Sequence, residues 1–280
     1  MARQSNASLG APSGPFRADQ IRDGDPYELS NGHPIHCMSS GRRHSLGQDA
    51  GHLTLSSDPA THAAPIDLGL TWGDAKHLRA PDLVVGEFEN LPGWEPGVPP
   101  LAVEYADRGQ DEGQLNEKIG ELLERGVKYI WVVRLTGPLR VEVYQPGQKV
   151  QLVEAEGELR APGVLQNAVP VRALVDREAA LEVTLRNLLN RKGYASLEAL
   201  LAAGEAKGRA EGEAKGQAEG EARGKAGSVL AVLLARGVEV PVPVRAQILQ
   251  CSDLAKLELW LVRATSATVA AEVLASDASG

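Results

Sequence analysis

The sequence predicts an α/β fold, a mixed sheet flanked by helices, followed by an all-α C-terminal extension. Short Val-rich runs separated by Gly and Pro turns fill much of the first 175 residues. One strongly amphipathic segment interrupts these runs, and the last hundred residues have a helical pattern. A chain of 280 residues is long enough for one full-sized domain and a smaller appended part.

Five apolar runs predict the strands of the sheet. They are DLVVGE (82–87), LAVEYA (101–106), KYIWVVR (128–134), LRVEVYQ (139–145) and KVQLVEA (149–155). Between the second and third runs, leucine and isoleucine recur at helical spacing on one stripe. This spacing predicts a helix over 111–125, with Gly126 as its C-cap. The order strand, strand, helix, strand, strand is that of an α/β core.

Composition divides the rest of the chain. Residues 1–15 are rich in Ser, Gly, Ala and Asn and predict a disordered lead-in to an α/β domain over 16–175. Residues 176–203 predict a helical connector, and residues 228–280 predict a small helical tail. In this tail, we expect Ser252 to be the N-cap of a helix.

Residues 204–227 form a four-residue repeat, GEAKGRAEGEAKGQAEGEARGKAG, with Gly at every fourth position. Opposite charges four residues apart favour a helix, whereas each interior Gly costs a helix about 1 kcal/mol relative to Ala. Small residues also allow two helices to approach closely. The repeat therefore predicts either a helix paired with a second copy, as in a coiled coil, or a flexible polar linker. We expect a homo-oligomer formed through this C-terminal helical region.

Charge and cysteine content exclude several classes. The net charge of −8 lies entirely in residues 1–180, which argues against a broad phosphate-binding surface. The two cysteines, Cys37 and Cys251, have neither the spacing of a zinc site nor that of a disulfide framework. We find no secretion signal and no apolar run long enough to span a membrane, so we expect a cytoplasmic protein with no membrane partner.

Two acidic residues at strand positions predict a metal site. Asp82 follows Pro81 at a strand start, and Glu104 lies inside an apolar strand, where burying a carboxylate is costly unless a cation is bound. Mg²⁺ prefers carboxylate and water oxygens, and Mn²⁺ is an alternative. On the following helix, Lys118 lies on one flank with Gln114, from which its ammonium can reach the strand ends.

Each of these residues also has an ordinary structural interpretation. An Asp after Pro is typical of a turn or cap, Glu104 fits a solvated edge strand, and Lys118 fits an exposed helix face. By the same reasoning, Arg42 and Arg43 are interpreted as solvated loop residues, and Trp131 as a core residue. The order and spacing of the acidic residues and the lysine favour the metal site.

The motif order resembles the Uma-type restriction-endonuclease family, a bacterial branch of the PD-(D/E)XK nuclease superfamily. The resemblance covers roughly residues 16–150 and rests on Glu28, Asn31-Gly32, Met38, His44, Pro81-Asp82, Glu104, Lys118, Gly126-Val127 and Trp131. It implies a restriction-endonuclease-like fold, Asp82 and Glu104 as metal ligands, Lys118 as the catalytic lysine, and Glu28 as the first acidic residue. Several positions depart from the family pattern. Ala106 replaces the ExK lysine, Gln114 replaces an acidic residue, and Asp107 replaces a serine. The Tyr-Trp pair with its trailing Asp becomes Ile130-Trp131 and Arg134.

Two functions follow as hypotheses. The first is a Mg²⁺-dependent endonuclease that hydrolyses phosphodiester bonds of nucleic acid, with DNA the expected substrate. The second is a catalytically weak scaffold that keeps the nuclease fold and acts in binding or assembly through its helical C-terminal part. The acidic charge and Ala106 motivate the second hypothesis.

Overall fold

The computed structural model describes residues 14–37, 39–73, 75–109 and 111–275. The chain forms two compact units, one up to Leu197 and one from Glu198 onward. The predicted lead-in over 1–15 lies almost entirely outside the described residues, as does Met38. In the described part of the chain, none of the helices combines the length and the hydrophobicity needed to cross a lipid bilayer.

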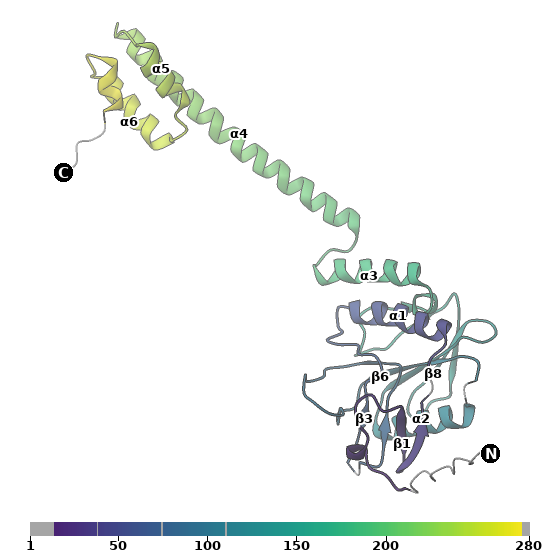
Figure 1. Cartoon of the computed structure of the whole chain (residues 1–280). Coiled ribbons are helices and arrows are strands. Elements are labelled where there is room, and N and C mark those ends of the chain that lie inside the picture. Colours follow the sequence, from purple (N-terminus) through teal and green to yellow (C-terminus); the bar gives the residue numbers. More distant parts are fainter. Residues whose placement is uncertain (1–13, 38, 74, 110, 276–280) are drawn as a thin grey trace, which may run out of the picture. The chain divides into compact units, whose positions relative to one another are not determined.

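The described residues of the first unit form two sheets, a short ribbon and three α-helices (Figure 1). Its helices are η1 (Ala18–Gln20), α1 (Arg42–Ser57), α2 (Glu112–Arg125), η2 (Val171–Leu174) and α3 (Arg177–Arg191). Its strands are β1 (Tyr27–Ser30), β2 (His33–His36), β3 (Leu70–Thr71), β4 (Leu78–Arg79), β5 (Leu83–Val85), β6 (Leu101–Ala106), β7 (Tyr129–Arg134), β8 (Arg140–Tyr144), β9 (Gln151–Glu154), β10 (Glu158–Leu159) and β11 (Val169–Pro170). The fold class predicted from the sequence, a mixed sheet flanked by helices, is confirmed.

The central sheet has the strand order β5-β6-β7-β8-β9. Strands β6 and β7 are parallel and joined through α2, and the other neighbouring pairs are antiparallel. Alternate residues of β6 serve the two faces of this sheet. Ala102 and Ala106 pack under α2 with Leu115 and Ile119, whereas Val103 and Tyr105 belong to the core on the other face. Glu104 therefore shares its side of the strand with the residues that α2 covers.

Helix α2 begins and ends as its sequence predicts. The side chain of Asp111, the N-cap, accepts a hydrogen bond from the Gln114 amide. Gly126 ends the helix with φ 109°, a left-handed conformation that suits glycine. The helix is thereby fixed at both ends above the sheet.

Helix α1 was not predicted, because its sequence is rich in Gly, Ser and His and has no strong apolar stripe. Arg42 and Arg43 begin this helix, so their interpretation as loop residues is wrong. A Cβ atom added at Gly51 would lie 2.0 Å from the Tyr105 hydroxyl, which donates a hydrogen bond to the Leu174 carbonyl. The glycines that weaken the helical pattern thus allow α1 to pack closely against β6 and η2.

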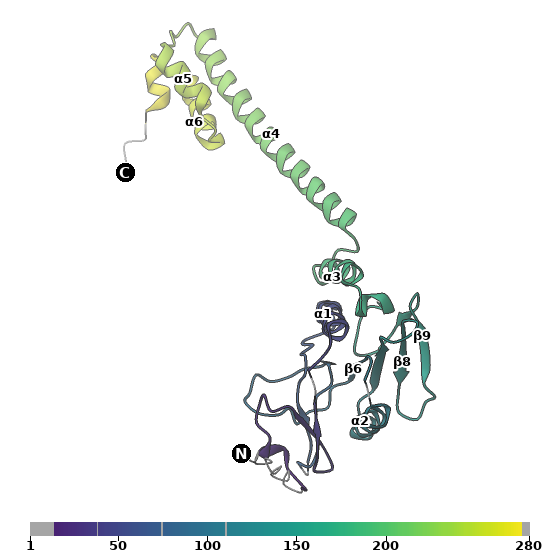
Figure 2. The same ribbon diagram turned by 45° about the vertical axis from the view of Figure 1, so that its right-hand side comes forward.

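Helix α3 lies beside α1 in both ribbon views (Figures 1 and 2). Thr184 donates a hydrogen bond to the Leu53 carbonyl, and Asn187 donates one to the Ser57 hydroxyl. Because of this packing, α3 belongs to the first compact unit, which extends past residue 175 to Leu197.

The small sheet has the order β2-β1-β4-β3 and carries the predicted Asn31-Gly32 hairpin. Asn31 and Gly32 have φ values of 46° and 79°, and positive φ at both positions is the geometry of a type I′ turn. Strand β4 pairs with β1 at Leu78 and Leu29. This separate pairing brings Glu28 next to Arg79 at the end of β4.

The second unit is helical and consists of α4 (Leu197–Ala235), α5 (Val242–Gln250), α6 (Leu254–Ala264) and η3 (Ala270–Leu274), with α4 beginning at the last residue of the first unit. The Gly repeat lies within α4, and residues 201–221 are exposed throughout. The C-terminal part of α4 packs with the other helices around Val229, Leu233 and Leu257. The N-cap of α6 is Asp253 and not Ser252, because the Asp253 carboxylate accepts hydrogen bonds from two backbone amides.

Candidate metal centre and nuclease site

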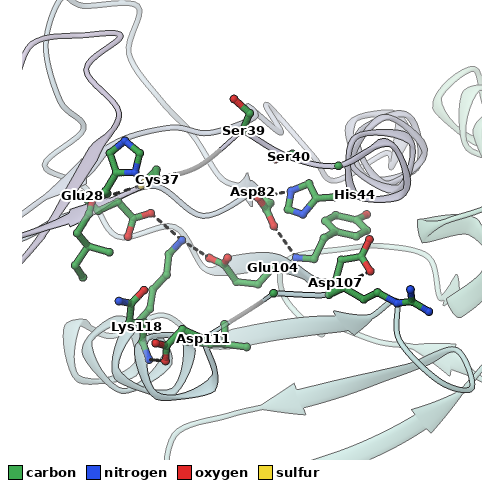
Figure 3. A pocket seen from close by; sticks show the side chains of 18 of the residues that line it. Glu28, Cys37, Ser39, Ser40, His44, Asp82, Glu104, Asp107, Asp111 and Lys118 are labelled. Carbon is green, nitrogen blue, oxygen red and sulfur yellow. Dashed lines mark hydrogen bonds and ion pairs between the residues drawn. The ribbon is translucent and has the colours of Figure 1, made fainter.

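A cavity of about 370 Å³ in the first unit collects every residue proposed for the site from the sequence. Its wall includes Glu28 from β1, Asp82, Glu104 from β6 and Lys118 from α2 (Figure 3). The start of α1 contributes His44. Three segments of the sheets and two helices therefore meet at one cavity.

Asp82 and Glu104 face each other across two neighbouring strands. Strand β5 pairs with β6 so that Leu83 lies opposite Val103. The antiparallel register places the next residue, Asp82, opposite Glu104. The Oδ2 atom of Asp82 accepts a hydrogen bond of 2.6 Å from the Tyr105 amide, which fixes its carboxylate at the end of the strand pair.

Glu104 is almost completely buried, with 7% of its surface exposed. Burial raises the pKa of Glu104 to about 8, since a carboxylate loses its hydration there. The Lys118 ammonium opposes this effect, whereas Asp82 and Glu28 add to it. A divalent cation bound at Glu104 would stabilise the ionised carboxylate, which burial disfavours.

Lys118 points into this carboxylate group and not toward solvent. Its Nζ atom lies 2.8 Å from Glu104 Oε1 and 3.0 Å from Glu28 Oε1. It also donates a hydrogen bond of 2.8 Å to the Ala80 carbonyl. Although burial alone disfavours the ammonium, the carboxylates of Glu104, Glu28 and Asp82 raise the pKa of Lys118 above its ordinary value. Lys118 therefore stays charged, with hydrogen bonds to Glu28 and to the Ala80 carbonyl and an ion pair with Glu104.

His44 contacts the second carboxylate of the pair. Its Nε2 atom lies 2.9 Å from Asp82 Oδ1, in a part-buried contact. The hydrogen bond with Asp82 raises the pKa of His44, against the opposing effect of burial. Asp82 is thus held by a ring nitrogen on one oxygen and a backbone amide on the other.

Comparison with known proteins identifies the family of the chain. A family model described as "Uma2: Putative restriction endonuclease" matches residues 16–172, which is more than half of the chain. The chain belongs to this family. No curated protein matches the chain significantly.

A solved structure supports the fold of this Uma2-family protein. A crystal structure described as "a putative nuclease belonging to DUF820" from Anabaena variabilis ATCC 29413 is similar with a TM-score of 0.50 and 18% sequence identity. The similarity covers 59% of this chain and 99% of that chain. It confirms the restriction-endonuclease-like fold, and family membership supports a nuclease.

Sequence reasoning missed Arg79, which also lines the candidate site. Arg79 lies on β4, is 1% exposed, and its guanidinium lies 3.1 Å from Glu28 Oε2. A signal was present, because Arg79 stands between Leu78 and Ala80, three residues before Asp82. A buried arginine at such a position requires carboxylate partners, but the sequence does not show which ones.

The residues present fit a hard divalent cation. Within the described ranges of the chain, no group of three or more His, Cys, Asp and Glu side chains is arranged to hold a metal ion. Mg²⁺, however, is commonly bound by one or two protein carboxylates together with water and substrate phosphate oxygens. Asp82 and Glu104 supply two such carboxylates, and each has lone pairs beyond those that its present partners use.

Proposed function

We propose that the protein is a metal-dependent endonuclease that hydrolyses phosphodiester bonds of nucleic acid, with DNA as its substrate. The observation that carries this proposal is the placement of Asp82 and Glu104 on opposed strand positions at one cavity, with Lys118 on Glu104. Family membership and the fold support the reaction class.

In this proposal, Asp82 and Glu104 hold Mg²⁺, or Mn²⁺ in its place. A bound divalent ion would supply Lewis-acid stabilisation of the charge that develops on the phosphoryl oxygens and would make water a stronger nucleophile. Hydrolysis then adds the water oxygen to phosphorus, breaks one bridging P–O bond, and leaves the proton of water on the departing oxygen.

The protein's own groups orient this reaction. Lys118 holds the Glu104 carboxylate in place, and its ammonium is near enough to the cavity to stabilise an anionic oxygen of the substrate. Lys118 donates hydrogen bonds to Glu28 and to the Ala80 carbonyl, so a contact with substrate would use its third N–H donor. Glu28 acts on Lys118 through their 3.0 Å ion pair, and His44 orients Asp82.

The purified full chain tests the proposal with supercoiled plasmid and single-stranded DNA in Mg²⁺ or Mn²⁺. We expect cleavage by the wild type and a loss of about 100-fold or more in Asp82→Asn and in Glu104→Gln. Glu142→Gln is the matched control, since Glu142 lies in the same row of the sheet, two strands away, and outside the cavity. Cleavage that persists in both site variants contradicts the assignment.

Calorimetric titration with Mn²⁺ separates the enzyme from the scaffold hypothesis. The enzyme requires Mn²⁺ binding that Asp82→Asn weakens and Glu142→Gln leaves intact. A folded wild type without such binding favours a scaffold that works through the helical second unit.

We also propose that the exposed part of α4 pairs with a second copy of the chain. Residues 201–221 are exposed throughout, and the glycines of the repeat make an unpartnered helix unfavourable by about 1 kcal/mol each. Close packing against a second helix offsets this cost. Light scattering should show fewer chains per particle after deletion of residues 204–280 than in the full-length protein. An unchanged oligomeric state contradicts the proposal.

A further inference from the structure

The buried guanidinium of Arg79 joins Glu28 on β1 to Glu121 on α2. Its NH1 atom lies 3.1 Å from Glu28 Oε2, and its Nε atom donates a 2.5 Å hydrogen bond to Glu121 Oε2. Glu121 lies on α2, one turn beyond Lys118. Arg79 on β4 therefore connects the small sheet to the same helix that carries the lysine.

Glu28 is held from both sides. Its Oε1 atom accepts hydrogen bonds from Lys118 Nζ at 3.0 Å and from the Ala80 amide at 3.2 Å. Its Oε2 atom faces Arg79. The position of the Glu28 carboxylate is consequently set by two cations, and a change at one of them is transmitted to the other.

Charge balance makes this arrangement sensitive to Arg79. Glu28, Glu104 and Glu121 are carboxylates with little exposure, and Arg79 and Lys118 are the cations between them. Without Arg79, Lys118 is the one charged partner that Glu28 keeps among the described residues, and Lys118 must then serve both Glu28 and Glu104. Removal of one partner from a buried ion pair leaves an uncompensated charge that rearranges its surroundings.

We infer that Arg79 is a positioning residue for the proposed reaction. By holding Glu28, Arg79 keeps the ammonium of Lys118 on Glu104 at the cavity wall. This role rests on the proposed nuclease function, and it concerns the rate of the chemical step and not the binding of nucleic acid.

Kinetics of oligonucleotide cleavage in Mn²⁺ test the inference with Arg79→Met, Arg79→Lys and a matched control. We expect Arg79→Met to lower kcat by about 10–100-fold with little change in KM, since small misplacements of catalytic groups have effects of this size. The kcat of Arg79→Lys should lie between those of the wild type and Arg79→Met, because one ammonium cannot replace a guanidinium that serves two carboxylates. If Arg79→Met does not fold, Arg79→Lys alone decides.

Arg134→Met is the control for the loss of a guanidinium that binds two carboxylates. Arg134 bonds Glu112 and Glu142 in the same unit but lies outside the cavity. We expect it to retain the wild-type kcat. Added guanidinium ion should restore part of the kcat of Arg79→Ala. It should leave the kcat of Arg134→Ala unchanged. A kcat within twofold of wild type in folded Arg79→Met and Arg79→Lys overturns the inference, as does an equal loss in Arg134→Met.

A second readout does not depend on cleavage. Reductive methylation followed by mass spectrometry measures how readily each lysine reacts, with the exposed Lys128 as internal reference. Lys118 should react slowly in the wild type and faster, relative to Lys128, in Arg79→Met or Arg79→Lys. Unchanged Lys118 reactivity in these variants overturns the inference. A wild type that cuts no substrate contradicts the proposed function, while this measurement still decides whether Arg79 positions Lys118.

Discussion

The Nζ atom of Lys118 lies 2.8 Å from Oε1 of Glu104 in a place where both side chains are nearly excluded from water. Lysine and glutamate side chains usually lie exposed on the protein surface, but these two do not. The contact joins α2 to β6 at Glu104, one of the two proposed metal ligands. Both residues are therefore expected to influence stability as well as catalysis.

The stability of the metal-free protein should fall as pH rises from about 5 to 8. The pKa of Glu104 is about 8 in the fold against an ordinary value of 4.5, so the folded state keeps a proton that the unfolded chain releases. The resulting slope is at most about 1.4 kcal/mol per pH unit. Urea denaturation in EDTA at several pH values measures the slope, and Glu104→Gln should make it shallower by removing the Glu104 contribution. An equal slope in that variant would falsify the assignment to Glu104.

The imidazole of His44 should titrate closer to its ordinary pKa of 6.5 in Asp82→Asn than in the wild type. The hydrogen bond with the Asp82 carboxylate is the main cause that raises the pKa of His44, and an amide does not stabilise the imidazolium in the same way. NMR of labelled histidines measures the titration. Asp49→Asn, an exposed change on the same helix, should leave the His44 titration unmoved. A His44 titration identical in wild type and Asp82→Asn would refute this coupling.

Gly51→Ala should destabilise the first unit by about 1–3 kcal/mol, the usual cost of overpacking a core. The added Cβ atom would meet the Tyr105 hydroxyl at 2.0 Å and displace its hydrogen bond to Leu174. Gly120→Ala on α2 is the control, since open space surrounds that position and alanine favours a helix by up to about 1 kcal/mol. Thermal denaturation of both variants checks this, and equal stability would contradict the close packing of α1.

Arg191→Ala should destabilise the first unit by about 1–3 kcal/mol, the cost of leaving a buried hydrogen-bonding group unsatisfied. The Arg191 side chain donates hydrogen bonds to the carbonyls of Ser57, Asp58 and Thr61, just where α1 ends. The neighbouring Lys192→Ala is the control. Chemical denaturation decides, and equal midpoints for the two variants would argue that α3 adds little to this unit.

Much of the fold could be predicted because local patterns and final structure agree. The caps at Asp111 and Gly126, the Asn31-Gly32 turn and the five runs of the central sheet depend on interactions within a few residues. Trp131 was expected in the core and is fully buried there. Helix α1 escaped prediction because its glycines are favourable only against the Tyr105 ring, a contact with a distant segment.

By itself, the sequence determined the fold class and the identity of the charged residues Glu28, Asp82, Glu104 and Lys118. Side-chain type, helical period and turn chemistry are local properties that can be read along the chain. The tertiary structure alone decided that these four residues line one cavity and that Arg79 supports Glu28. Burial and pairing of charges depend on strand register and helix packing, which join residues more than fifty positions apart.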